Sequence, residues 1–268
     1  ILRVNQFLTL HFKLNNKNIL IHRILNWHHT NNVINFYAFQ SDEYDGLGRD
    51  EKNLFEYSSN NLESKPYKTT FSKQDLNELK DLDSLKKHLE GFDGCALKKT
   101  STNLVFSDGN EESKVMLIGE APGEEEDKTG KPFTGQAGKL LDKMLNAIGQ
   151  NRENTYITNL IFWRPPGNRN PSLEEVDVCL PFVLRHIELI NPKILILAGA
   201  VAAKAILKEN NKGIIQLRGK WQNFSLNKAT IIKTMPIFHP SFLLRQPSRK
   251  RDAWEDLKKI KKEIDLIT

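Results

Sequence analysis

Residues 114–120 read KVMLIGE, a short and almost uninterrupted apolar run that ends in a glycine and a glutamate. Three further runs of this kind lie at 155–163, 193–200 and 230–240, and patterns typical of helices separate them. Continuous apolar strands that alternate with helices are typical of a parallel sheet covered on both faces. The sequence therefore predicts the α/β class, a three-layer α/β/α sandwich around a short, mainly parallel central sheet of about four strands.

The chain before this alternating part has a different composition. Residues 1–71 are rich in Asn, Lys and Ser, and their one apolar periodic piece, ILIHRILNW at 19–27, predicts a single helix followed by a mobile linker. From Ser72 a Ser-x-x-Asp cap and leucines at helical spacing predict the first helix of a compact domain. We therefore expect an N-terminal extension over residues 1–71 and a catalytic domain over residues 72–268.

Composition narrows the classes of partner and the compartment. The 268 residues carry a formal net charge of +6 with a pI near 9.1, which favours a polyanionic partner such as nucleic acid. Cys95 and Cys179 are too few for a disulfide framework, and the start of the chain lacks the pattern of a signal peptide. No apolar run approaches the ~18 residues that a spanning helix needs. We expect a cytoplasmic monomer without a membrane partner.

The polar segments that follow the strands are expected to meet, because open parallel sheets bind ligands beyond the carboxyl ends of their strands. The first strand is followed by GEAPGEEED at 119–127, the second by NLIFWRPPGNRNP at 159–171, and the fourth by HPSFLLRQPSRKR at 239–251. The glycines suggest a phosphate loop, but Gly138-Lys139 is followed by Leu140 instead of Ser or Thr. A nucleotide triphosphate site is therefore not expected.

The acidic residues 124–127 suggest a second chemistry. Hard divalent ions such as Mg²⁺ prefer oxygen ligands, and carboxylate sites of this kind occur in many nucleases. Four consecutive acids, however, point in different directions from any regular backbone, and the other strand ends supply Asn159 and His239 instead of acids. A magnesium-dependent nuclease stays open as an alternative.

Three motifs together, GEAPGEEEDKTGKPFTGQAGKLL, NLIFWRPPGNRNP and HPSFLLR, resemble the uracil-DNA glycosylase superfamily in their order and spacing. The resemblance is greatest to its family four, a bacterial and archaeal group, and covers about residues 79–268. It implies a DNA repair enzyme that flips uracil out of DNA, hydrolyses its N-glycosidic bond and leaves an abasic site for base excision repair. A catalytically silent DNA-binding protein of the same fold is the alternative from another class.

The resemblance also implies roles for single residues. Glu120 would place a carboxylate near the sugar, and His239 would donate a hydrogen bond to the uracil O2 as negative charge develops there. Asn159 would bind the N3 and O4 edge of uracil, Phe133 would stack on its ring, and Glu126 would exclude the methyl group of thymine.

The remaining residues implied in this way contact the base or the DNA backbone. Leu243 or Leu244 would wedge into the gap that the flipped nucleotide leaves. The expected contacts are Ala121 with the base and Pro122, Gly123, Arg164, Arg169, Ser241, Leu243, Leu244, Arg245, Arg249, Lys250 and Arg251 with the DNA. No lysine lies at an assigned pocket position, so we expect a monofunctional enzyme that does not cleave the strand.

The cysteines depart from the pattern of family four, which usually holds a 4Fe-4S cluster through four of them. The matching positions here are Phe92, Cys95, Trp163 and Cys179. Two thiolates cannot hold a cluster that needs about four protein ligands, and the two aromatic residues suggest that apolar side chains fill the space. We therefore expect no cofactor and no metal, with Cys95 and Cys179 as remnants of the pattern.

Overall fold

The computed structural model divides the chain into two compact units, Ile1–Pro66 and Tyr67–Thr268. It describes residues 6–14, 17–25, 76–227 and 230–267. In the first unit, β1 (Gln6–Leu14) and β2 (Lys17–Leu25) pair as an antiparallel hairpin.

The helix predicted at 19–27 is wrong over residues 19–25, because these residues belong to β2. The segment contains three isoleucines, and β-branched residues favour the extended backbone. The expected linker and the boundary at residues 71 and 72 lie outside the described residues.

The second unit is built on a six-stranded sheet in the order β3-β5-β4-β6-β8-β7. Its four inner strands are parallel to one another and coincide with the four apolar runs: β4 (Val115–Gly119), β5 (Tyr156–Asn159), β6 (Ile194–Ala198) and β8 (Ile231–Ile237). The predicted mainly parallel sheet is confirmed. The expected number of about four strands was too low, because two short antiparallel strands, β3 (Asp108–Gly109) and β7 (Gln222–Ser225), form the edges.

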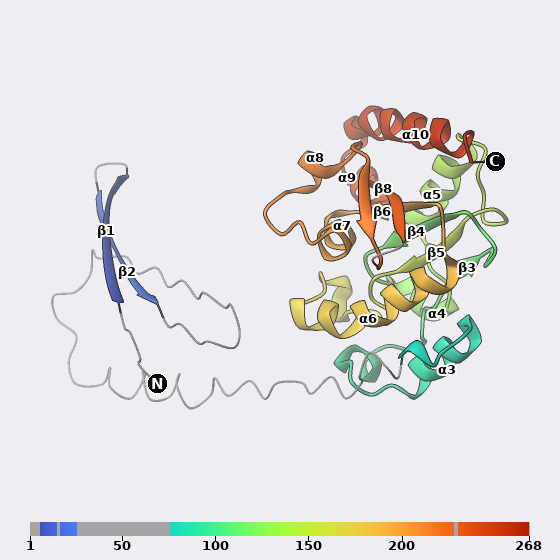
Figure 1. Ribbon diagram of the computed structural model, residues 1–268, viewed down its shortest axis with the longest axis horizontal. Coiled ribbons are helices and arrows are strands. Elements are labelled where there is room, and N and C mark those ends of the chain that lie inside the picture. Colours follow the sequence, from blue (N-terminus) through green and yellow to red (C-terminus); the bar gives the residue numbers. More distant parts are fainter. Residues whose placement is uncertain (1–5, 15–16, 26–75, 228–229, 268) are drawn as a thin grey trace. The chain divides into compact units, whose positions relative to one another are not determined.

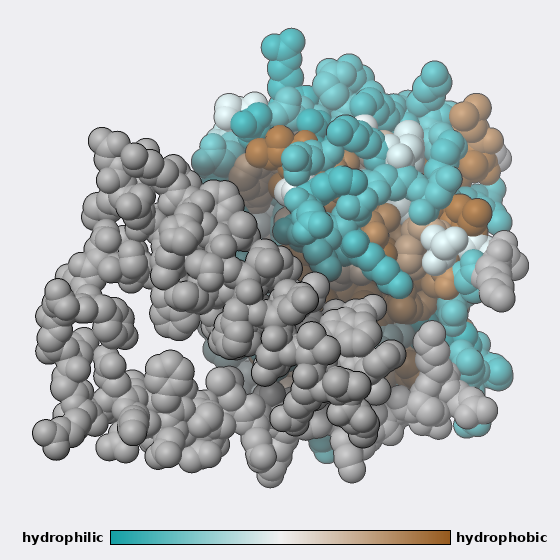
Figure 2. All heavy atoms as spheres, turned by 60° about the vertical axis from the view of Figure 1, so that its left-hand side comes forward, coloured by the Kyte–Doolittle hydropathy of each residue, from teal (hydrophilic) through white to brown (hydrophobic). Residues whose placement is uncertain are grey.

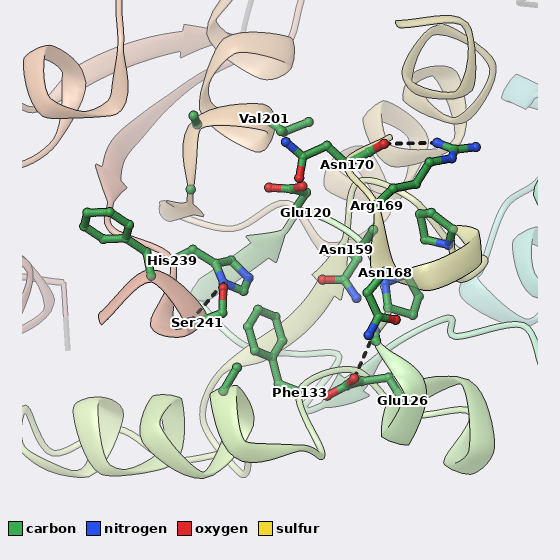
Figure 3. Close-up of a pocket in the computed structure, with 18 of the residues that line it drawn as sticks. Glu120, Glu126, Phe133, Asn159, Asn168, Arg169, Asn170, Val201, His239 and Ser241 are labelled. Carbon is green, nitrogen blue, oxygen red and sulfur yellow. Dashed lines mark hydrogen bonds between the residues drawn. The ribbon is translucent and has the colours of Figure 1, made fainter. Parts of the chain in front are cut away.

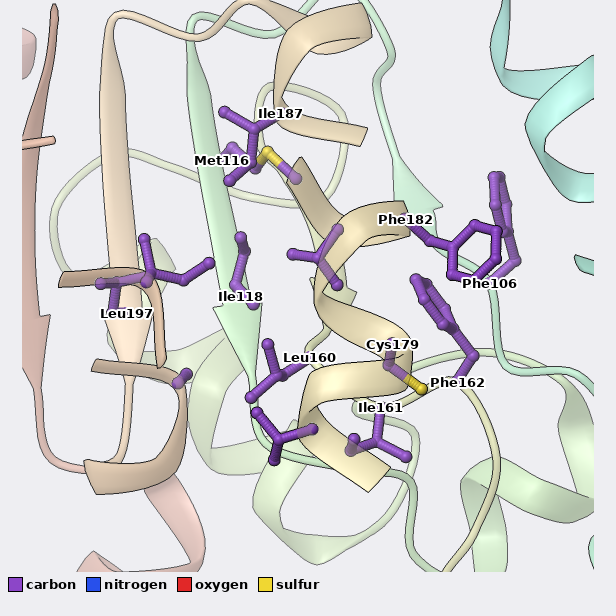
Figure 4. Packing of buried hydrophobic residues seen from close by; sticks show 14 of the residues in the cluster. Phe106, Met116, Ile118, Leu160, Ile161, Phe162, Cys179, Phe182, Ile187 and Leu197 are labelled. Carbon is purple, nitrogen blue, oxygen red and sulfur yellow. The ribbon is translucent and has the colours of Figure 1, made fainter. Parts of the chain in front are cut away.

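Helices cover both faces of this sheet (Figure 1). One face carries α3 (Leu82–Gly91), α6 (Leu173–Ile190) and α7 (Ala200–Leu207), and the other carries α5 (Gln136–Asn146), α9 (Pro240–Arg245) and α10 (Lys250–Ile264). Side chains of β4 alternate between the faces, with Met116 and Ile118 in one core cluster and Val115 and Leu117 in the other. Figure 4 shows part of the first cluster, in which Ile118 of the sheet lies between Leu197 of the neighbouring strand and α6.

The shorter helices lie in the connections. They are η1 (Ala96–Lys99), α4 (Glu124–Thr129), η2 (Pro166–Asn168), α8 (Ile214–Leu217) and η3 (Pro247–Arg249). The helical pattern that begins at Ser72 is not a single helix, because α3 begins only at Leu82. Asp81 and Ser84 form a capping box that fixes this start.

The connections around β4 open a crevice at its carboxyl end. The chain leaves β4 toward α5 on one face, whereas it leaves the neighbouring strands β5 and β6 toward α6 and α7 on the other face. Such a change of direction separates the loops above the sheet and is the usual place for a ligand in open α/β folds. The residues that follow β4 and β6 therefore border a cavity.

Among the described residues no helix combines the length and the apolar character needed to cross a bilayer. The face of the described domain visible in Figure 2 is largely hydrophilic, with hydrophobic residues in smaller patches.

Candidate functional site

The strand ends enclose a cavity of about 490 Å³. Glu120 follows β4, Asn159 ends β5, Gly199 follows β6, and His239 follows β8. Figure 3 shows the side chains of Glu120, Asn159 and His239 around this space, with the ring of Phe133 between Asn159 and His239. The structure thus brings together, around one cavity, four of the residues for which the resemblance implied contacts with the base or the sugar: Glu120, Phe133, Asn159 and His239.

Glu120 is a desolvated carboxylate at the opening of the crevice. Burial raises its pKa above the usual range, and the positive charge of Arg245 partly offsets this effect. The backbone carbonyl of Glu120 accepts from the N–H of Ile161 at 3.0 Å, which fixes the residue to the segment after β5. Its side chain accepts no hydrogen bond from any described residue, so the carboxylate is available to water or substrate.

His239 is neutral and its ring protonation is set by its neighbours. Burial, together with the nearby charge of Arg245, lowers its pKa from 6.5 to about 4. The backbone N–H of Ser241 donates to Nδ1 at 3.2 Å, and the Ser241 hydroxyl lies 2.7 Å from the same nitrogen. Because a backbone N–H can only donate, Nδ1 is an acceptor and the single proton of the neutral ring is on Nε2.

Asn159 and Phe133 approach each other over Gly119. A Cβ atom at Gly119 would lie 2.3 Å from the Asn159 side-chain oxygen and 2.5 Å from the ring of Phe133. The ring of Phe133 also stacks on the ring of His239, with centroids 5.5 Å apart and an interplanar angle of 28°. Any side chain at Gly119 would therefore displace the two groups expected to hold the base.

The backbone of Phe133 is strained. Its φ of +56° lies in the left-handed region, which costs a non-glycine residue roughly 1–2 kcal/mol. Strained residues persist where the surroundings hold them, and they are frequent at ligand sites.

Glu126 lines the cavity, but hydrogen bonds occupy its carboxylate. One oxygen accepts from the N–H groups of Thr134 and Gly135, both at 2.9 Å, and the other accepts from the N–H of Gly123 at 3.0 Å. The sequence predicted a contact between Glu126 and the base. In the structure its charge is directed to the protein backbone.

The other acids of this loop are separated in space. Glu124 and Glu125 are exposed and pair with Lys128 at 2.8 and 3.4 Å. Asp127 is buried, and its side chain accepts from the N–H groups of Thr102 and Asn103. The five carboxylates at 120–127 therefore do not form one site.

The two leucines of α9 differ in position. Leu243 is 1% exposed and belongs to the core, whereas Leu244 is 42% exposed. Of the two residues expected to wedge into DNA, only Leu244 is accessible without rearrangement of the helix. Ser241 and Arg245 line the cavity.

The basic residues also differ in their availability. Arg249, Lys250 and Arg251 are exposed at the start of α10, although Arg249 pairs with Asp252 at 3.2 Å. Arg169 lines the cavity, but its guanidinium binds both carboxylate oxygens of Glu175, at 2.6 and 2.9 Å.

Arg164 is half-buried and donates to the Asn168 side chain at 2.7 Å. Ala121, Pro122 and Gly123 line the cavity, and their expected contacts with the base and the DNA stay predictions.

Comparisons with known proteins bear directly on this pocket. Residues 106–258 match the family described as the uracil DNA glycosylase superfamily. The chain belongs to this superfamily.

Several relatives support the same assignment. The chain is 41% identical to the type-4 uracil-DNA glycosylase of Thermotoga maritima over 63% of this chain and 88% of the relative. It is 37% identical to that of Archaeoglobus fulgidus, over 68% and 92%, and 40% identical to that of Saccharolobus solfataricus, over 63% and 80%. The resemblance drawn from the three motifs is confirmed.

The positions that match the cluster ligands of this superfamily's family four lie together in the core. Cys95 and Cys179 are both free, buried thiols that act on each other's ionisation. Phe92 and Trp163 occupy the other two positions, with ring centroids 6.3 Å apart. The interaction with Cys95 and burial raise the pKa of the Cys179 thiol well above its usual range, which disfavours the metal-binding thiolate at Cys179, whereas the same interaction lowers the pKa of the Cys95 thiol.

These residues do not fit a 4Fe-4S cluster. Phe182 packs on Phe92 with centroids 4.9 Å apart, so aromatic rings fill the space on that side. His186 is buried near these positions, but its Nε2 lies 2.7 Å from the hydroxyl of Tyr156. Within the described residues no three His, Cys, Asp or Glu side chains are grouped to hold a metal ion.

Neither Asn170, which lines the cavity, nor Arg152, which does not, was among the residues predicted from the sequence. Asn170 lines the cavity, and Figure 3 shows its side chain beside Glu120; its place in the second motif was the available signal. Arg152 lies behind the pocket between α5 and β5 and contacts the backbone of Phe133. No local motif marks Arg152, because its partners come from distant parts of the sequence.

The protonation of His239 can be measured by NMR. In protein labelled with ¹⁵N at histidine and held at pH 6, we expect a neutral ring with its proton on Nε2, because the pKa is about 4. His239→Gln identifies the resonance by its loss. A doubly protonated ring at pH 6 would contradict the assignment.

Proposed function

We propose that this cavity binds a uracil flipped out of DNA and hydrolyses its N-glycosidic bond, with Glu120 and His239 as the catalytic residues. As a member of the superfamily, the protein is a uracil-DNA glycosylase, a hydrolase that acts on N-glycosyl bonds in base excision repair. The observation that carries the assignment of residues is the convergence of a desolvated carboxylate and a neutral imidazole on one cavity.

The reaction develops two opposite charges. The sugar gains positive charge as the bond breaks, and the departing base carries negative charge. The carboxylate of Glu120 stabilises the positive charge and accepts a proton from the attacking water. Because few competing groups solvate this carboxylate, its attraction to the sugar is strong when the charge appears.

His239 acts on the departing base. Its Nε2–H donates to the uracil O2, and this bond strengthens as O2 becomes negative. The ring serves as a donor without being charged, since Ser241 holds Nδ1 as an acceptor and the pKa of about 4 keeps the ring neutral at physiological pH.

Asn159 and Phe133 select the base. The amide of Asn159 accepts from N3–H and donates to O4, and cytosine presents the reverse pattern at this edge. Because Asn159 is buried, binding of cytosine would leave its amide without hydrogen-bond partners, which costs about 1–3 kcal/mol of binding free energy for each unsatisfied group. The buried ring of Phe133 provides the apolar surface for the base.

The DNA strand would lie across the exposed side of the pocket. Leu244 occupies the gap left by the flipped nucleotide, and Arg245 lies beside it with its charge close to Glu120 and His239. Arg249, Lys250 and Arg251 then contact phosphates, which makes affinity decrease with salt. Arg169 contributes less, because Glu175 neutralises it.

The two alternatives fit the geometry less well. A magnesium-dependent nuclease needs acids that point to one ion, whereas Glu124 and Glu125 face solvent and Glu126 binds backbone N–H groups. A silent DNA-binding protein would not require the convergence of Glu120 and His239 on the cavity.

The reaction is tested with an oligonucleotide that contains one uracil, incubated with EDTA and then treated with hot alkali. We expect breakage at the uracil only after alkali, and a loss of about a hundredfold or more in Glu120→Gln. Glu125→Gln, an exposed acid in the same loop, serves as the matched control and keeps full activity. Breakage before alkali would favour the nuclease, and binding without breakage would favour the silent protein.

The two leucines of α9 give a second prediction. Leu244→Ala should lower the rate on double-stranded DNA more than on single strands, because only the duplex needs a wedge to hold the base out. Leu243→Ala should instead lower the free energy of unfolding by about 2–5 kcal/mol, since it leaves a cavity in the core. Equal losses of Leu244→Ala on both substrates would contradict the wedge.

The absence of a cluster is the third prediction. Purified protein should contain no stoichiometric iron, show no broad visible absorbance, and keep its activity in chelator. The double variant Phe92→Cys with Trp163→Cys, treated with iron and sulfide, is a positive control that supplies four thiols. Four irons in each unaltered chain would contradict the prediction.

A further inference from the structure

The backbone around Phe133 is held from two sides. Phe133 has a strained φ of +56°, and it follows a proline and precedes two residues whose N–H groups point away from the ring toward Glu126. Left alone, such a segment would relax to an ordinary conformation and move the ring.

Arg152 holds the carbonyl groups of this segment. Its guanidinium donates to the Phe133 oxygen at 2.5 Å and to the Pro132 oxygen at 3.1 Å. Asp108 of β3 and Asp142 of α5 accept from the same guanidinium at 2.6 and 2.9 Å. The two carboxylates therefore orient a rigid planar group whose remaining donors reach the backbone.

Glu126 holds the N–H groups of the same segment. One carboxylate oxygen accepts from Thr134 and Gly135, while the other accepts from Gly123 at the start of α4. The carboxylate thus joins the segment after Phe133 to the loop that follows Glu120. Charged acceptors form stronger hydrogen bonds to N–H groups than neutral ones do.

The close approach of this segment to α5 depends on Gly138. A Cβ atom there would lie 1.6 Å from the Phe133 oxygen, so no other residue fits without movement of the backbone. Gly138 permits the conformation, whereas Arg152 and Glu126 bind it directly.

We propose that Glu126 and Arg152 are positioning residues, a backbone clamp that fixes the ring of Phe133 against the base. The proposal rests on the proposed function, because it takes Phe133 as the surface on which the flipped uracil packs. It assigns Glu126 to the protein backbone in place of the edge of the base, and it gives a role in base binding to Arg152, which does not line the cavity.

The main experiment combines Arg152→Lys with Phe133→Ala. Lysine keeps the charge but cannot bind two carbonyls and two carboxylates in a plane. We measure the single-turnover rate on a uracil oligonucleotide, its KM, and the inhibition constant of free uracil. Arg152→Lys should lower the rate and weaken uracil binding by about tenfold each, with KM for the oligonucleotide nearly unchanged.

The double variant shows whether the effect passes through Phe133. If it does, adding Arg152→Lys to Phe133→Ala should change the single-turnover rate and the inhibition constant of uracil by less than about twofold. A full additional loss in that background would overturn the clamp, because Arg152 would then act elsewhere.

Arg185→Lys is the matched control for general damage. Arg185 also caps a backbone carbonyl, that of Leu79, and pairs with Glu188 at 2.8 Å, but it does not line the cavity. It should lower thermal stability about as Arg152→Lys does while leaving the rate and uracil inhibition within about twofold. Equal kinetic losses in both variants would overturn a specific role for Arg152.

Glu126→Gln provides a test that does not depend on Arg152. Glutamine keeps one acceptor oxygen but cannot accept from both Thr134 and Gly123 as the carboxylate does. The clamp predicts that Glu126→Gln excises uracil from DNA more slowly than the unaltered protein and does not excise thymine. Release of thymine by this variant would overturn the clamp in favour of a contact with the base edge.

Failure of the proposed function gives a different result. If Phe133→Ala alone keeps the full rate and the full affinity for uracil, the stacking role itself is wrong. If Phe133→Ala is impaired while Arg152→Lys and Glu126→Gln resemble the unaltered protein, the proposed function stands and the clamp is wrong.

Discussion

The pocket depends on the absence of a side chain at Gly119, where three segments meet at the end of β4. Parallel pairing places Gly119 opposite Asn159, and the ring of Phe133 lies over the same point. Since Glu120 is the next residue in the chain, the register of β4 and β5 also places Glu120 and Asn159 at the same end of the sheet, where both line the cavity. A change of register by one residue would turn these side chains away from each other.

Burial shifts the pKa values of Glu120 and His239, the two groups proposed to be catalytic, in opposite directions. It raises the pKa of Glu120 and lowers that of His239, so that in both cases the charged form is disfavoured. An incompletely solvated carboxylate is stabilised most when positive charge appears next to it, as it does on the sugar during bond cleavage. The interaction is therefore stronger in the transition state than in the ground state, which is the requirement for a faster reaction. The depressed pKa of His239 also lowers stability as pH falls from 6.5 toward 4, because the unfolded imidazole gains a proton that the folded one does not.

The sequence predicts those parts of the structure that depend on local patterns, namely the inner strands and the polar segments that follow them. Four apolar runs predicted the four parallel strands, and their polar ends brought Glu120, Asn159 and His239 together as expected. The two-residue strand β3 has no pattern of its own, and its pairing with β5 becomes visible only in the sheet. The strand β2 is a case in which a pattern is present but does not decide the structure, because the spacing of its isoleucines fits either a helix or a strand.

Side-chain roles were harder to predict where partners are distant in the sequence. Leu243 and Leu244 are adjacent, and only the packing of α9 on the core separates a buried residue from an exposed one. The resemblance implied that Glu126 lies at the base, whereas its hydrogen-bond partners Thr134 and Gly135 come eight and nine residues later in the chain. Arg152 is farther still from its partner Asp108, 44 residues away.

Aromatic residues stand at two of the positions that match the cluster ligands of family four, so side-chain packing supports this part of the domain. A cluster stabilises a fold only after metal has been inserted, so that a site of thiolates couples stability to metal supply. Phe92, Trp163 and Phe182 pack on one another as part of the main core, and such aromatic pairs contribute about 0.5–1.5 kcal/mol beyond the area they bury. The segment between α3 and β3 is thereby held by the same apolar packing as the sheet. Since Trp163 directly precedes the loop that carries Asn168 and Asn170 to the cavity, this packing also anchors one wall of the catalytic pocket.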